Sequence, residues 1–289
     1  VGKHRESIPY HDKSLEIKPN FDYALYAKGH ALYYTGNPYK GLELVGKSLE
    51  LNPNYDHAWL AKAEICLGLE DTHGALECID NALLLNTAFG EAWEMKGDIM
   101  KMLDRRTEAS LCYTEALKCY DGAILNNPME KEWYLKKAQL LEKLGLYEEV
   151  CEVYASLTSV KEKDVDVWKK RIKALLFIGK NTEALDVFED AKRKKAVDAE
   201  TYVLGAEALC SLGRYEEALS ALDRALAIDP KSPGAHEAMA EVLVQMHRPL
   251  AAYLHYRAAG RKARWKGLLK SDLKPAASLF ADGLVDSVG

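Results

Sequence analysis

Nowhere in the 289 residues of this sequence do about 18 uncharged apolar residues follow one another, as a membrane-spanning helix requires. No secretory leader is visible near the N-terminal end. Apolar residues make up 48% of the chain and charged residues 29%, which is typical of a soluble protein. We therefore expect no membrane span and favour a cytoplasmic location.

The cysteines show no metal-binding pattern. There are six of them: Cys66, Cys78, Cys112, Cys119, Cys151 and Cys210. None forms a C-x-x-C pair or has a histidine at zinc-ligand spacing. Most lie beside apolar helix positions, which favours buried thiols in a reducing compartment over disulfides. We expect no metal site and no cofactor.

Sequence motifs for catalysis are also missing. The chain contains no P-loop, G-x-G-x-x-G, G-x-S-x-G or H-E-x-x-H motif, and His236-Glu237 is followed by Ala-Met-Ala. His247 and His255 are eight residues apart, or about 12 Å along one helix, too far for a shared metal. We predict no catalytic residues and no enzymatic activity.

What the sequence does contain is a repeat of 34 residues. Its units begin at Asp22, Asp56, Gly90, Lys131, Val165, Ala199 and Pro233, and the third unit has 41 residues instead of 34. A period of this length indicates a repeat architecture, in which each unit buries its apolar face against its neighbours.

Three positions of the unit show a consistent residue type. Position 4 is bulky: Leu25, Trp59, Trp93, Tyr134, Trp168, Tyr202 and His236. Position 8 is small in six of seven units: Gly29, Ala63, Gly97, Ala138, Ile172, Ala206 and Ala240. Position 20 is also mostly small: Gly41, Ala75, Ala109, Val150, Ala184, Ala218 and Ala252. Small residues at these positions let two helices approach closely, and Pro19, Pro53, Pro128 and Pro230 end helices.

These positions resemble the tetratricopeptide repeat family, whose unit is a helix-turn-helix of 34 residues. The resemblance implies an all-α fold, a right-handed superhelical solenoid of such units with a C-terminal capping helix. We expect the second half of a truncated repeat at 1–21, repeats at 22–55, 56–89, 90–130 (with a seven-residue insertion), 131–164, 165–198, 199–232 and 233–266, and a cap at 267–289. The partial first unit suggests that the natural protein continues upstream, where a targeting segment could lie.

Turns and one insertion complete the expected architecture. We place the turns inside the units at Gly36, Gly68, Gly145, Gly179 and Gly213. Thr87, Glu162 and Ala196 replace the closing proline and are expected to weaken those connections. The insertion of seven residues equals two helical turns, so it lengthens a helix by about 10.5 Å and rotates its facing side by only about 20°.

The resemblance further implies that the first helices line a concave binding groove. The candidate ligand residues there are Tyr23, Tyr26, His30, Tyr33, Tyr34, Leu60, Glu64, Glu94, Asp98, Lys169, Lys173 and Phe177. Their character changes from aromatic through acidic to basic and apolar. Family members that capture chaperone C-terminal tails use asparagine at position 9, whereas this chain never does. We therefore predict a protein or peptide ligand that is not such a tail.

The C-terminal end is basic. Between Arg248 and Lys274 there are eight Lys or Arg residues and one acid, a local charge of +7 against −12 for the rest. The candidate patch is Arg257, Arg261, Lys262, Arg264 and Lys266. We favour a role as part of a cap over the open core, ahead of an acidic protein partner and ahead of nucleic acid or a membrane surface.

These observations favour a non-enzymatic scaffold that binds a segment of another protein in its concave groove. The alternatives are a recognition arm of a larger enzyme or regulator, and binding of nucleic acid or an acidic partner through the basic end. Self-association through the partial first repeat is a further alternative.

Overall fold

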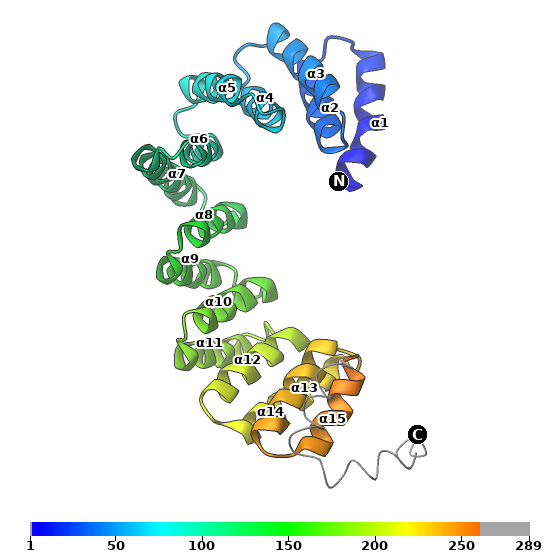
Figure 1. Ribbon diagram of the computed structural model, residues 1–289, viewed down its shortest axis with the longest axis vertical. Coiled ribbons are helices and arrows are strands. Elements are labelled where there is room, and N and C mark those ends of the chain that lie inside the picture. The colour runs from blue at the N-terminus through cyan, green and yellow to red at the C-terminus, as the bar shows by residue number, and fades with distance from the viewer. Residues whose placement is uncertain (1, 261–289) are drawn as a thin grey trace. The chain divides into compact units, whose positions relative to one another are not determined.

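The computed structural model describes residues 2–260, and every secondary-structure element among them is an α-helix. The fold is therefore all-α, as expected. The chain divides into two compact units, Val1–Pro128 and Met129–Gly289, called unit 1 and unit 2 below. Within each unit, consecutive helices pack against each other as antiparallel hairpins (Figure 1).

Unit 1 contains one leading helix and three hairpins. The helices are α1 (Gly2–Ile17), α2 (Asp22–Tyr34), α3 (Pro38–Leu51), α4 (Asp56–Gly68), α5 (Thr72–Leu85), α6 (Gly90–Met102) and α7 (Arg106–Asn126). The first helices of the hairpins begin at Asp22, Asp56 and Gly90, where the 34-residue period places the starts of repeats.

Unit 2 contains four hairpins. Its helices are α8 (Lys131–Leu144), α9 (Tyr147–Val160), α10 (Val165–Phe177), α11 (Asn181–Arg193), α12 (Ala199–Ser211), α13 (Tyr215–Ile228), α14 (Pro233–Gln245) and α15 (Pro249–Ala258). First helices α10, α12 and α14 also contact one another in sequence order. We propose that each hairpin in both units is one repeat, with the bounds given above.

Small residues allow the helices of a hairpin to touch. A Cβ atom added to Gly29 on α2 would lie 2.7 Å from the backbone oxygen of Gly41 on α3, and one added to Gly41 would lie 2.7 Å from the oxygen of Gly29. Gly97 on α6 packs in the same way against the ring of Tyr113 on α7. Small side chains at positions 8 and 20 therefore set the distance between the two helices, as the sequence indicates.

The turns inside the hairpins all use position 15 of the repeat. The backbone there has a positive φ, whether the residue is glycine or not: Gly36, Glu70, Asp104, Gly145, Gly179, Gly213 and His247. The prediction of a turn at Gly68 was wrong, because Gly68 is the last residue of α4 and Glu70 forms the turn. Gly68 serves packing instead, since a Cβ there would lie 2.5 Å from the hydroxyl oxygen of Tyr33.

The tryptophans at position 4 connect their hairpins to the end of the preceding one. The indole Nε1 of Trp59 donates to the carbonyl of Pro53 at 2.8 Å, Trp93 donates to Thr87 at 3.0 Å, and Trp168 donates to Glu162 at 2.8 Å. Because the acceptor is a backbone oxygen, the connection does not need proline. The expected weakening at Thr87 and Glu162 is therefore not seen in these contacts.

Helix α7 contains the additional residues of the third repeat. It has 21 residues, whereas α3 and α5 have 14 each. Tyr120 in its later part is buried, and its ring fills the space beside Gly90 at the start of α6. The added turns thus pack on the first helix of the same hairpin.

Two expectations concern residues beyond those described. The C-terminal cap at 267–289 lies outside them, as do Arg261, Lys262, Arg264 and Lys266 of the basic patch, while Arg257 is an exposed residue in the last turn of α15. Between residues 2 and 260, no helix is both long enough and apolar enough to cross a membrane.

Candidate functional site

First helices α2, α4 and α6 line a cavity of about 600 Å³ in unit 1. Eight of the twelve predicted ligand residues line it: Tyr26, His30, Tyr33, Tyr34, Leu60, Glu64, Glu94 and Asp98. The aromatic and acidic sections that we expected to follow one another share this one cavity. Tyr23 is not among the lining residues and is 52% exposed.

Aromatic rings form one wall of this cavity. The ring of Tyr26 stacks on His30 with centroids 6.0 Å apart, and His30 meets Tyr34 edge-on at 5.0 Å. His4 from α1 stacks on Tyr34 at 4.6 Å. Tyr26 and Tyr33 also pack on the buried core of the unit, whereas Tyr34 is 40% exposed. Tyr34 is therefore the tyrosine of this wall that a ligand reaches at least structural cost.

Glu64 connects this wall to α4. Its Oε2 lies 2.6 Å from Nε2 of His30, and the hydroxyl of Tyr34 donates to both carboxylate oxygens at 3.3 Å. Burial and the neighbouring Glu64 carboxylate raise the pKa of Tyr34 to about 12. The phenol thus stays protonated and acts as a donor at neutral pH.

Tyrosines of α7 orient the carboxylates on α6. The hydroxyl of Tyr113 donates to Oδ1 of Asp98 at 2.7 Å, and that of Tyr120 donates to Glu94 at 3.1 Å. Burial and these carboxylates raise the pKa of both tyrosines above the ordinary value. The lining contains Glu64, Glu91, Glu94 and Asp98 but no lysine or arginine.

The remaining predicted residues lie on α10 in unit 2. Lys173 and Phe177 line a separate cavity of about 350 Å³, bounded by α8, α9 and α10. The ring of Phe177 is 68% exposed, and its centroid lies 4.4 Å from that of Tyr147. Phe177 is therefore accessible from solvent, and its contact with a ligand stays a prediction.

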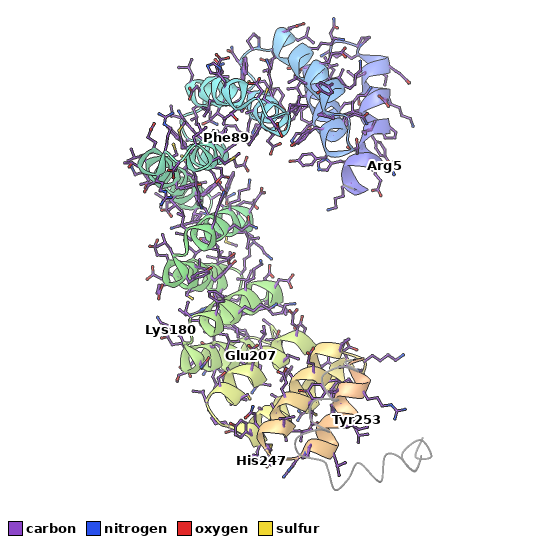
Figure 2. All side chains as sticks on the ribbon, in the orientation of Figure 1. Arg5, Phe89, Lys180, Glu207, His247 and Tyr253 are labelled. Atoms are coloured by element: carbon purple, nitrogen blue, oxygen red, sulfur yellow. The ribbon has the colours of Figure 1, made fainter. Side chains whose placement is uncertain are left out.

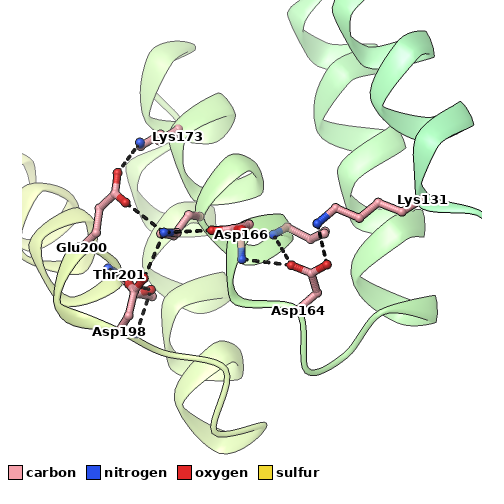
Figure 3. Close-up of polar contacts among 9 residues, drawn as sticks. Lys131, Asp164, Asp166, Lys173, Asp198, Glu200 and Thr201 are labelled. Atoms are coloured by element: carbon pink, nitrogen blue, oxygen red, sulfur yellow. Dashed lines mark hydrogen bonds and ion pairs between the residues drawn. The ribbon is translucent and has the colours of Figure 1, made fainter. Parts of the chain in front are cut away.

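Lys169 has a different role from the one expected. Its Nζ lies 2.9 Å from Oδ2 of Asp198, 2.9 Å from Oε2 of Glu200 and 3.0 Å from Oδ1 of Asp166. Its side chain is only 14% exposed. Figure 3 shows these contacts, which join α10 to the start of α12. Lys169 is thus a connection between two hairpins, because its ammonium is already surrounded by carboxylates.

The second lysine of this network is more accessible. Nζ of Lys173 lies 2.6 Å from Oε1 of Glu200, and its side chain is 53% exposed. The hydrogen bonds from Lys173 and Lys169 hold the pKa of Glu200 below its ordinary value. Burial alone would raise the pKa of Asp198, but its hydrogen bond with Thr201 and the Lys169 ammonium keep it lowered.

Sequence reasoning missed several neighbours of these sites. His4 was absent from the prediction, although its ring stacks on Tyr34 in the wall of the unit 1 cavity. In unit 2, Nδ1 of His236 lies 3.0 Å from Nδ1 of His255. These histidines lie at positions 4 and 23 of one repeat, a pairing that the column positions could have revealed. No group of three or more candidate metal ligands occurs among residues 2–260.

The fold and these sites can now be compared with known proteins. The sequence model of a family described as TPR repeat matches residues 206–246, which cover the second half of α12, all of α13 and α14 and the turns between them. Residues 206–246 thus belong to a tetratricopeptide repeat. A search of curated protein sequences gives no match to this protein.

Several solved structures are similar to this one at low identity. Yeast Tom70 is 17% identical with a TM-score of 0.49, and the match covers 99% of this chain and 60% of Tom70. A tetratricopeptide repeat protein of Parabacteroides merdae is 18% identical with a TM-score of 0.43, over 84% of this chain and 93% of the other. Pseudomonas aeruginosa pilF is 16% identical with a TM-score of 0.46, over 76% and 97% respectively.

Proposed function

We propose that this tetratricopeptide repeat protein is a non-enzymatic interaction scaffold that holds a segment of another protein in the cavity of unit 1. The observation that carries this proposal is the cavity itself, which three consecutive first helices form and polar-tipped aromatic rings line. Stacked repeats present extended surfaces of this kind for binding. The proposal includes a cytoplasmic location and no catalytic residue, cofactor or metal.

The side chains of the cavity suit a peptide ligand. Tyrosine gives a large contact area at little conformational cost and keeps a hydroxyl for hydrogen bonding. Tyr34 is held by Glu64 and His4, so it loses little freedom when a ligand arrives. Such preorganisation favours binding because fewer groups must be ordered at that moment.

A chaperone C-terminal tail fits this cavity poorly. The terminal carboxylate of such a tail would approach Glu64, Glu91, Glu94 and Asp98, which are all carboxylates. Like charges at short distance repel each other. We therefore retain the prediction that the ligand is of another kind, with Phe177, Lys173 and the exposed Tyr23 as further proposed contact residues.

Site-specific photo-crosslinking tests the proposal. A benzophenone amino acid replaces Tyr34 in one variant and Tyr39 in the other, since Tyr39 is 77% exposed on α3 and does not line the cavity. We expect a protein to be crosslinked from position 34 and not from position 39, with the attachment confined to one segment of that protein. Equal crosslinking from both positions, or none from either, would contradict a ligand site in this cavity.

A further inference from the structure

The cavity of unit 1 combines aromatic faces with a carboxylate, and this combination indicates the charge of its ligand. Tyr26, His30 and Tyr34 present rings beside Glu64. A ring face attracts cations through its quadrupole, by about 0.5–2 kcal/mol for one well-placed side chain. A cavity of about 600 Å³ is large enough for several residues of a peptide.

Glu64 keeps acceptor capacity for a ligand. A carboxylate has about four lone-pair sites, and the described contacts of Glu64 are those with His30 and Tyr34. The two Tyr34 contacts are long, at 3.3 Å, and come from one neutral hydroxyl. The side chain of Glu64 is 30% exposed. An arginine could therefore bind it as a charge-assisted, two-pronged contact.

Other ligand chemistries fit less well. An anionic segment would meet carboxylates, as argued above for a C-terminal tail. A wholly apolar segment would remove Glu64 from water without supplying an opposite charge, and such uncompensated burial is costly. The described contacts of Glu64 are with His30 and Tyr34 and include no lysine or arginine, so a basic ligand would supply the charge that Glu64 attracts.

We propose that the cavity of unit 1 selects a basic peptide segment, with an arginine or lysine of the ligand bound between Glu64 and the rings of Tyr34 and Tyr26. This assignment rests on the proposed function and specifies its ligand. The cavity and its aromatic wall define the place, and Glu64 defines the sign of the charge.

Fluorescence anisotropy with two labelled probe peptides tests this assignment. Both probes have twelve residues and consist of alanine and glycine except at every third position. That position is arginine in one probe and citrulline, which has nearly the same shape but no charge, in the other. We expect the intact chain to bind the arginine probe at least ten times more tightly. Glu64→Gln should remove most of this preference, because it keeps the shape and loses the charge.

The control variant is Glu43→Gln. Glu43 lies on α3, pairs with Lys40 and Lys47 on the surface, and does not line the cavity. The Glu43→Gln variant loses one negative charge outside the cavity and therefore measures the general attraction of basic peptides to an acidic protein. Its affinity for the arginine probe should equal that of the intact chain. Circular dichroism should show unchanged helix content in both variants.

Three outcomes would overturn the assignment. The first is equal affinity of the intact chain for the two probes. The second is an equal loss of affinity for the arginine probe in Glu64→Gln and Glu43→Gln. The third is no binding of the arginine probe at a protein concentration of about 100 μM. The crosslinking experiment separates this failure from failure of the proposed function. A neutral or acidic segment attached at position 34 would keep the scaffold and reject the basic ligand, whereas no attachment would reject both.

Discussion

The two units use the inner face of their first helices in opposite ways. In unit 1, position 9 of one repeat contacts the next through His30 and Glu64, and the rings around them leave a cavity. In unit 2, position 9 contacts the next repeat through Lys173 and Glu200, and Lys169 adds further ion pairs. Unit 1 has 13 basic and 19 acidic residues, whereas unit 2 has 26 and 25. The comparison teaches that the same repeat position can border a cavity in one region and take part in an ion-pair network in another.

The largest expected effect comes from removing a position 4 ring in unit 2. Trp168 is only 4% exposed, so Trp168→Ala should lower the free energy of unfolding by about 3–5 kcal/mol. Trp59→Ala in unit 1 should cost less, because Trp59 is half-buried. Urea unfolding combined with hydrogen exchange measured by mass spectrometry locates each effect. Equal losses would show that burial at position 4 does not distinguish the units.

A smaller effect is expected at position 8. Gly29→Ala places a methyl group 2.7 Å from a backbone oxygen of α3, so the two helices must separate. Such overpacking costs about 1–3 kcal/mol and exceeds the gain of up to about 1 kcal/mol in helix propensity. We expect urea unfolding to show a net loss of about 1–2 kcal/mol in the free energy of unfolding.

The matched change in unit 2 runs in the other direction. Ala206 occupies position 8 there and is buried, and Ala206→Gly should cost about 1 kcal/mol. Stabilisation by Gly29→Ala would show that the close approach of α2 and α3 has room to relax.

The smallest effect concerns the ion pairs that distinguish unit 2. Lys169→Met should lower stability by about 1 kcal/mol near pH 7, since the partners are partly exposed. The pKa values of Asp198 and Glu200 are lowered from 3.8 and 4.5, so their contribution is complete above these values and is lost as pH falls below them. The difference between the two proteins should therefore shrink below about pH 4.

Urea unfolding across this pH range checks the prediction, with Lys170→Met as the control. Lys170 is exposed on the same helix. A difference that stays constant down to about pH 2.5 would show that the Lys169 aliphatic chain, and not its charge, stabilises α10 against α12.

Much of the fold could be predicted because it depends on spacing. A period of 34 with bulky residues at position 4 and small residues at positions 8 and 20 is sufficient to predict the all-α fold, which is confirmed, and residues 206–246 match the model of the family that the period resembles. Figure 2 labels Phe89, which the period places just before a first helix, and the structure has it there. His247, also labelled, lies in a turn before α15, so the prediction that it shares one helix with His255 was wrong. These features are local, so each unit specifies them by itself.

The site depended on contacts between repeats, which a column of residue types does not contain. Gly68 was misplaced in a turn because its real neighbour is the Tyr33 ring of the preceding repeat. Lys169 looked like a free cation because its partners Asp198 and Glu200 belong to the next hairpin. Tyr34 and Glu64 lie together because both occupy predicted groove positions of consecutive first helices. That a ligand binds them stays a prediction.

The length of α7 shows how such an array can change size. A seven-residue insertion returns the following residues to nearly the same helix face, whereas one of five residues would turn them by about 140°. At the level of the gene, lengthening of a packed helix is thus tolerated in steps of about 21 nucleotides. Repeat arrays would therefore be expected to vary their helix lengths in discrete increments, and Tyr120, one such step further along α7 than Tyr113, packs against α6 as Tyr113 does.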